Sequence, residues 1–322
     1  MLSLFAFFMN KKCSCVRRPI KAAAFFYLAA LFVFMPLISY ASNVAILVST
    51  SVRPYIEAVD GLSKALLEKN VRSEVFYLER FQGKGRMDLA GLLRDDRWDL
   101  RVAVGPNAAL FLEEDSKKDD PPILYTMVLN PAGVLSDAVP GCGVPLDIPV
   151  DVQMEGISRA MPGLRRLGLL YDPAYNSRFF EEGLKKAASL GLTIHPVAVT
   201  ARKDIPSAID ANIDKIDAIW MIPDRTVIAE SIVEYVIKEA MLKKIPTVGY
   251  NKFFYENGAA AAFVFDYNEI GRQTAGIVLD ALKGVDCVTQ VPRFRLWLNP
   301  RTLKVLGIDP PKLIQPPVEW GP

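Results

Sequence analysis

The chain has 322 residues, a formal net charge of +2, one histidine and four cysteines. Five of its 38 basic residues and none of its 36 acidic residues lie in the first 41 positions, which leaves 33 basic against 36 acidic residues in the rest. This slightly acidic body excludes the basic face typical of nucleic-acid-binding proteins, and its length suffices for two lobes with separate cores.

The N-terminal segment has the layout of an export signal. Basic residues precede an apolar run at Ala22–Tyr40, and Ser39 and Ala41 place small side chains where signal peptidase cleaves. We therefore expect a cleavable signal peptide over residues 1–41 and a periplasmic protein that begins at Ser42. The alternative is an uncleaved membrane anchor, because the apolar run approaches the length of a bilayer span.

Cys142 and Cys287 are the two cysteines that follow this leader. An exported chain permits a disulfide between them. Two separate buried thiols are also compatible with the sequence, because nothing in it gives the distance between the two Cα atoms. The sequence therefore leaves this pairing open.

Short apolar runs that predict strands alternate with amphipathic segments that predict helices along the mature chain. The predicted strands are 44–48, 72–78, 100–104, 123–128, 167–171, 192–199, 218–222, 246–248, 260–265 and 294–298. The predicted helices are 54–69, 87–93, 106–113, 149–161, a segment around 180–188 closed by Gly191, 204–213, a long one that starts at 223–226 and ends at Leu242, 267–283 and 300–306.

This alternation predicts an α/β fold, since a right-handed strand–helix–strand crossover places its two strands parallel. A Gly- and Pro-rich break at 133–149 separates two runs of similar plan. We therefore predict two Rossmann-like lobes, each a parallel sheet flanked by helices; one doubly wound domain is the alternative. The Pro-rich end from Pro310 onwards is expected to lie extended on the surface.

Polar residues follow seven of the predicted strands. Each of them alone could be no more than a helix cap or a turn residue. In parallel sheets, however, ligands bind at the carboxyl edge of the strands, and the architecture brings all seven strand ends to such an edge. The candidate ligand-binding residues are Ser49, Thr50, Asn107, Asn130, Asn176, Asp224, Thr226, Tyr250 and Asp266.

The sequence lacks the motifs of common enzymes. His195, the single histidine, lies in an apolar strand and is expected to be structural. There is no nucleophile elbow, phosphate loop, dinucleotide fingerprint or His/Cys cluster for a metal. We therefore predict a protein without catalytic residues, metal or cofactor. A two-carboxylate hydrolase is the remaining enzymatic alternative, because Asp172, Asp224 and Asp266 could converge in the cleft.

The mature chain resembles the ABC-transporter substrate-binding proteins that include the tryptophan-binding lipoprotein-like receptors. The resemblance spans about Asn43 to Ile308 and rests on the order and spacing of five stretches. They are MPGLRRLGLLYDPAYNS (161–177), IDAIWMIPDRTVI (216–228), KKIPTVGYNKFFYENGA (243–259), FDYNEIGRQTAGIVLDALKG (265–284) and LWLNPRTLKVLGI (296–308). The chain departs from the family at Asn130-Pro131, where relatives often have Asp-Pro, at Asn107, where they tend to Thr or Ser, and in lacking a lipobox.

The resemblance implies a type I periplasmic-binding fold whose lobes are joined by a hinge of three crossings, near residues 145, 266 and 288. The implied division is 42–145 plus about 266–288 for the N-terminal lobe, 146–265 plus about 289–310 for the C-terminal lobe, and 311–322 for a tail.

The implied function is that of a monomeric periplasmic receptor. It would capture a small polar or amino-acid-like ligand in the cleft for an ABC permease of the inner membrane. A ligand-sensing module for a membrane sensor kinase is the alternative, and the sequence does not separate the two. An amino-acid zwitterion fits the charges, since the helix start at Gly105 favours a carboxylate and Asp224 favours an ammonium group.

Overall fold

The computed structural model describes residues 42–114, 116, 120–135 and 142–322. The expected signal peptide, residues 1–41, lies outside this part of the chain. None of the helices in the described ranges combines the length and the apolar character needed to span a bilayer.

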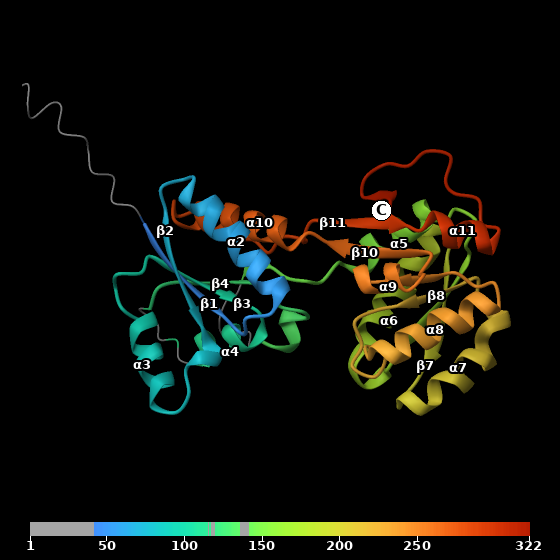
Figure 1. Cartoon of the computed structure of the whole chain (residues 1–322), viewed down its shortest axis with the longest axis horizontal. Coiled ribbons are helices and arrows are strands. Elements are labelled where there is room, and N and C mark those ends of the chain that lie inside the picture. The colour runs from blue at the N-terminus through green and yellow to red at the C-terminus, as the bar shows by residue number, and fades with distance from the viewer. Residues whose placement is uncertain (1–41, 115, 117–119, 136–141) are drawn as a thin grey trace, which may run out of the picture. The chain divides into compact units, whose positions relative to one another are not determined.

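The N-terminal lobe is built on a five-stranded sheet of order β2–β1–β3–β4–β5 in which all pairs are parallel (Figure 1). Both faces of β1 are buried, because its alternate side chains enter two different cores. Val44 and Ile46 face helices α2 and α10, and Ala45 and Leu47 face α3 and α4. The elements are β1 (Asn43–Val48), α2 (Arg53–Leu67), β2 (Arg72–Tyr77), α3 (Lys84–Leu93), β3 (Leu100–Val104), α4 (Pro106–Glu114), β4 (Ile123–Thr126), β5 (Cys142–Val144) and α10 (Tyr267–Ala281).

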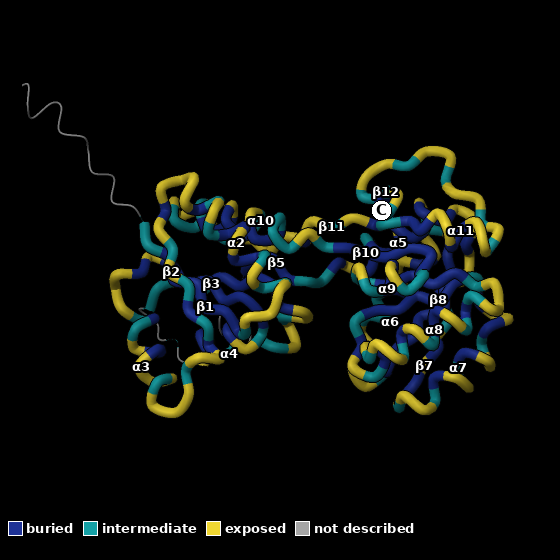
Figure 2. Tube along the Cα trace, viewed as in Figure 1, coloured by how far each residue is buried: buried dark blue, intermediate teal, exposed yellow. Residues whose placement is uncertain are grey.

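The C-terminal lobe is built on a seven-stranded sheet of order β12–β11–β10–β9–β8–β6–β7. Helices α5, α6 and α11 cover one face, and α7, α8 and α9 cover the other. The inner strands of both sheets are mostly buried, whereas the edge strands β2, β7 and β12 and the outer sides of the helices are partly exposed (Figure 2). The elements are α5 (Val150–Ala160), β6 (Arg166–Tyr171), α6 (Pro173–Ala187), β7 (Thr193–Ala198), α7 (Ile205–Asn212), β8 (Ala218–Met221), α8 (Glu230–Leu242), β9 (Thr247–Gly249), α9 (Lys252–Glu256), β10 (Ala261–Phe265), β11 (Phe294–Leu298), α11 (Pro300–Leu306) and β12 (Val318–Trp320).

The predicted fold class, two lobes of parallel strands flanked by helices, is therefore confirmed, with four local corrections. Strand β11 runs antiparallel to β10, because α10, which connects them, packs in the other lobe and makes no crossover over this sheet. Strand β5 lies within the break at 133–149, where no strand was predicted. In addition, α8 begins only at Glu230 and not at 223–226, because the chain first forms a turn in which the N–H groups of Val227 and Ile228 donate to the carbonyl oxygen of Asp224. The C-terminal end is not a free tail, since β12 pairs with β11 and buries Val318 in the core; three residues are too few to show a strand pattern.

A disulfide closes the edge of the N-terminal sheet. Cys142 in β5 is bonded to Cys287, which follows α10, and their Cα atoms lie 5.9 Å apart. Next to it, the backbone N–H of Gln290 donates to the carbonyl oxygen of Gly143. The bond that the sequence left open thus fixes the chain after α10 along the outer side of β5.

Helices α2 and α10 lie side by side with their backbones in contact (Figure 1). A Cβ atom at Gly271 would lie 2.0 Å from the carbonyl oxygen of Ala58, and one at Gly61 would lie 2.0 Å from that of Asn268. Glycine is needed at both positions because a side chain would have to push one helix backbone away from the other.

We expect Gly271→Ala to lower the free energy of unfolding by about 1–3 kcal/mol, as overpacking does in other cores. Gly276→Ala is the matched control in the same helix, because a Cβ there has nothing within 4 Å; it should raise stability by up to about 1 kcal/mol. Urea unfolding of both variants measures the difference. Equal effects of the two substitutions would contradict close packing of α2 on α10.

Candidate ligand-binding site

Three of the candidate residues meet where β6 and β8 end. The Asp224 side chain is 2% exposed. Its Oδ2 accepts hydrogen bonds from the backbone N–H of Asp172 at 2.8 Å and from Nδ2 of Asn176 at 2.7 Å. Its Oδ1 accepts from the backbone N–H of Thr226 at 2.8 Å. Asp224 therefore joins two neighbouring strand ends.

Asp172 is the second carboxylate of this cluster and is 3% exposed. Its Oδ1 accepts from the backbone N–H of Ala174 at 2.9 Å, which caps α6, and its Oδ2 accepts from the Thr226 hydroxyl at 2.7 Å. Asn176 leaves helical geometry, with φ −126° and ψ 20°, and its side chain reaches Asp224. In the described part of the chain, these hydrogen bonds to the two carboxylates all come from neutral donors.

Tyr250 follows β9 and lies in the field of the same cluster. The pKa of its hydroxyl is raised above the ordinary value, first by burial and second by the negative charge of Asp224. Its ring packs on Phe254 with centroids 4.5 Å apart. The site therefore combines a neutral phenol with two buried carboxylates, an arrangement suited to a cationic group.

In the N-terminal lobe, Ser49 connects the end of β1 with the start of α4. Its Oγ accepts a hydrogen bond from the backbone N–H of Ala108 at 2.9 Å. Gly105 adopts φ +87°, and a Cβ there would come within 2.8 Å of Ser49 Oγ. Asn107 is exposed in the first turn of α4, and Thr50 is half-buried after β1. Ser49 thus caps α4 from a buried position, and its hydroxyl can in addition donate one hydrogen bond.

Asn130 adopts a left-handed backbone conformation with φ 48° and is exposed. Its backbone N–H donates to Oδ2 of Asp147 at 2.6 Å. Burial raises the pKa of Asp147 to about 6, and the Asn130 N–H opposes that rise. The loop that carries Asn130 is therefore held by a carboxylate that titrates near neutral pH.

Asp147→Asn is expected to stabilise the protein at pH 7.5 and to make little difference near pH 4. A raised pKa means that the folded state binds the proton more tightly than the unfolded state. Protonation of Asp147 therefore stabilises the wild type below pH 4, and this contribution is lost as the pH rises through about 6, whereas asparagine stays neutral at every pH. A shift of about two pKa units corresponds to at most about 3 kcal/mol. Urea unfolding of wild type and variant across this range tests it, and a difference that does not change with pH would contradict the assignment.

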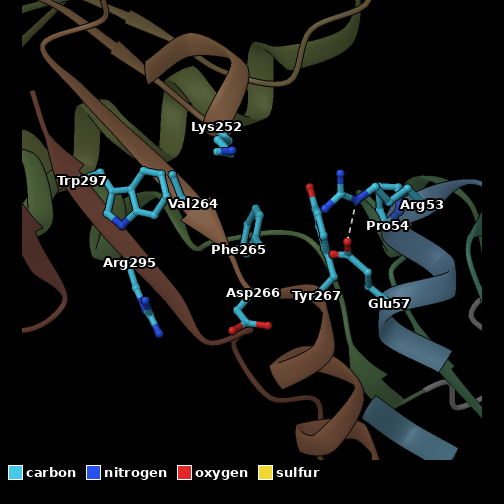
Figure 3. A pocket seen from close by; sticks show the side chains of 10 residues that line it. All are labelled: Arg53, Pro54, Glu57, Lys252, Val264, Phe265, Asp266, Tyr267, Arg295 and Trp297. Atoms are coloured by element: carbon cyan, nitrogen blue, oxygen red, sulfur yellow. Dashed lines mark hydrogen bonds and ion pairs between the residues drawn. The ribbon is translucent and has the colours of Figure 1, made fainter. Parts of the chain in front are cut away.

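Asp266 caps α10, since its Oδ1 accepts from the backbone N–H of Glu269 at 3.0 Å. It also lines a cavity of about 400 Å³ (Figure 3). The sequence prediction missed the other residues of this cavity. They are Arg53, Pro54 and Glu57 of α2, Lys252 of α9, Val264 and Phe265 of β10, Tyr267 of α10, and Arg295 and Trp297 of β11.

A signal for part of this set exists in the sequence. Arg53 and Lys252 stand in the first helical turn after a strand end, the position from which the candidate residues were chosen. No such signal exists for Arg295 and Trp297, because they lie inside a strand whose antiparallel direction the sequence does not reveal.

His195 lies in a contact between two secondary-structure elements. His195 Nε2 lies 3.0 Å from Asn212 Oδ1, a structural contact between β7 and α7. Within residues 42–114, 116, 120–135 and 142–322, no three His, Cys, Asp or Glu side chains are grouped as metal ligands would be.

The chain is similar to known proteins in both sequence and fold. A family model described as "ABC transporter substrate binding protein" matches residues 43–315. No protein of curated function matches the sequence. A conserved domain protein from Vibrio cholerae is 26% identical, with 84% of this chain and 96% of that chain covered and a TM-score of 0.57.

Two further solved structures are similar in fold. A ligand-free, open substrate-binding protein with adhesive properties from Clostridium difficile is 21% identical over 87% of this chain and 99% of that chain, with a TM-score of 0.71. An ABC domain in complex with L-Trp from Streptococcus pneumoniae is 22% identical over 84% and 96%, with a TM-score of 0.57. The predicted type I periplasmic-binding fold is thereby confirmed.

Proposed function

Because this chain belongs to the family of ABC transporter substrate-binding proteins, we propose that it is the periplasmic receptor of an ABC importer and captures an amino-acid-like ligand between its lobes. The observation that carries the proposal is the pair Asp172 and Asp224. Both carboxylates are buried at the carboxyl edge of β6 and β8, and their described hydrogen bonds all come from neutral donors.

A buried carboxylate favours a cation because charge interactions are stronger away from water. The ammonium group of an amino acid would supply that charge at Asp224, beside the Tyr250 hydroxyl. The ligand carboxylate would accept from the start of α4, where Asn107 lies, and from the Ser49 hydroxyl. The L-Trp complex of the Streptococcus pneumoniae protein supports this ligand class.

The lobes would close over the ligand about three chain crossings, near residues 145, 266 and 288. The lobe boundaries would be those expected from the sequence, except that β12 extends the C-terminal lobe to Trp320. In support, β10 ends at Phe265 in the C-terminal sheet and α10 begins at Tyr267, while Ile270 of α10 is packed in the N-terminal core. Small-angle scattering should then show compaction on ligand binding, as hinge closure requires.

In this proposal the receptor is a monomer that binds a small molecule and the permease, without nucleic acid, cofactor or catalysis. Thr50, Asn130, Thr226 and Asp266 are proposed as further ligand contacts. A sensor-kinase module with the same ligand is the alternative function.

Thermal denaturation in the presence of each of the twenty L-amino acids tests the proposal. At a hundredfold excess over its Kd, a ligand stabilises the folded state by about 2.7 kcal/mol, which is a measurable shift in Tm. For the amino acid with the largest shift, the analogue without the amino group should bind at least about tenfold more weakly, since a charge-assisted hydrogen bond contributes about 1.5–3 kcal/mol.

Two outcomes would contradict the proposal: no amino acid shifts the Tm, or the analogue without the amino group binds equally well. Uptake of the labelled ligand by cells lacking the gene separates transport from sensing. Loss of uptake supports the importer, and unchanged uptake supports the sensor alternative.

A further inference from the structure

The C-terminal strand β12 is anchored at several points on the C-terminal lobe. The N–H of Leu296 donates to the carbonyl oxygen of Pro317 at 2.7 Å, and the N–H of Gly321 donates to that of Leu298 at 3.0 Å. The Tyr255 hydroxyl donates to the carbonyl oxygen of Pro322 at 2.8 Å. The end of the chain is therefore held in register beside β11.

This register places Glu319 directly opposite Trp297. The indole Nε1–H of Trp297 donates to Glu319 Oε1 at 2.7 Å. The guanidinium of Arg295 lies 3.7 Å from the same oxygen, and these side chains are 56% and 42% exposed. Such an exposed ion pair contributes little because water screens it. The hydrogen bond to Trp297 is the stronger of the two contacts.

Trp297 and Arg295 both line the cavity of about 400 Å³ described above (Figure 3). The Trp297 ring also contacts the Tyr255 ring edge-to-face, with centroids 5.3 Å apart. The indole is thus fixed at its N–H by Glu319 and at its ring by Tyr255, and it is presented to the cavity as part of the wall.

We propose that Glu319 is a positioning residue for ligand binding, and that β12 is a functional part of the pocket. Glu319 acts through Trp297: its carboxylate holds the indole in the orientation that completes the cavity wall. The inference rests on the proposed function, because it takes this cavity as part of the ligand site.

The hydrogen bond allows the positioning role of Glu319 to be distinguished from an effect on the stability of the fold. Glu319→Ala removes the acceptor, whereas Glu319→Gln keeps an oxygen that accepts from the indole and removes only the charge. Glu155→Ala is the matched control, since it removes an exposed carboxylate that pairs with Arg159 on α5, outside the cavity.

The test uses two readouts on the full exported protein. The first is the indole N–H resonance of Trp297 in ¹H–¹⁵N spectra without ligand, assigned by its loss in Trp297→Phe. The second is binding of the L-amino acid that gives the largest thermal shift, measured by calorimetry. Loss of one neutral-to-charged hydrogen bond predicts binding about two- to tenfold weaker in Glu319→Ala.

The expected result is a shifted Trp297 resonance and weaker binding in Glu319→Ala, with both restored in Glu319→Gln and unchanged in Glu155→Ala. Wild-type affinity in Glu319→Ala would overturn the inference and leave the proposed function standing. Glutamine as damaging as alanine would also overturn it, since the charge and not the indole contact would then matter. If wild type binds no amino acid, the proposed function fails, and an unmoved Trp297 resonance would overturn the positioning role independently.

Discussion

Replacing both Cys142 and Cys287 by alanine is expected to lower the free energy of unfolding by about 4–5 kcal/mol. The disulfide closes a loop of 145 residues, and chain-entropy models give about 4.7 kcal/mol for a loop of about 100 residues. Because a typical domain is stable by only about 5–15 kcal/mol, this is a large fraction of the total. Guanidinium unfolding of wild type and the double variant under oxidising conditions measures the loss.

Wild type treated with a reductant provides the matched control. It should unfold at the same denaturant concentration as the double variant, and the double variant should not respond to the reductant. Wild type that is insensitive to the reductant, while its thiols become accessible to a labelling reagent, would show that the bond contributes little to stability.

The second large effect is expected at Asp224. The hypothesis that Asp224 is only a helix cap predicts that asparagine replaces it without cost, because both residues cap equally well. In the structure, however, both carboxylate oxygens accept hydrogen bonds, one from Thr226 and the other from Asp172 and Asn176. An asparagine NH₂ in either orientation faces at least one of these donors. An unsatisfied buried donor costs about 1–3 kcal/mol, so Asp224→Asn should lower stability by that amount without any ligand.

Asp266→Asn is the control for this substitution. Asp266 is exposed and caps α10 through one hydrogen bond to the backbone N–H of Glu269, so asparagine should be almost neutral there for stability. Urea unfolding compares the stabilities of the two variants. Calorimetry then measures the ligand affinity of folded Asp224→Asn, which should fall in addition to the loss of stability. An Asp224→Asn variant as stable as wild type would contradict the hydrogen-bonded cluster around Asp224.

Local patterns in the sequence determined the succession of elements. Apolar runs marked ten of the strands in the described residues to within two residues at either end, and Pro106 begins α4 as its missing N–H allows. The spacing of Asp266 and Glu269 is a sequence signature of a helix start, and in the structure Asp266 caps α10. These features are readable because strand burial and helix capping depend on residues within a few positions of one another.

Contacts between distant residues were decided only by the tertiary structure. The sequence placed Asn176 and Asp224 at strand ends, but it could not show that they bond to one another, because that depends on β6 lying next to β8. The antiparallel direction of β11, the pairing of β12 and the disulfide have the same origin. Each depends on which segments lie side by side in the folded lobes. The order of residues along the chain does not determine those neighbours.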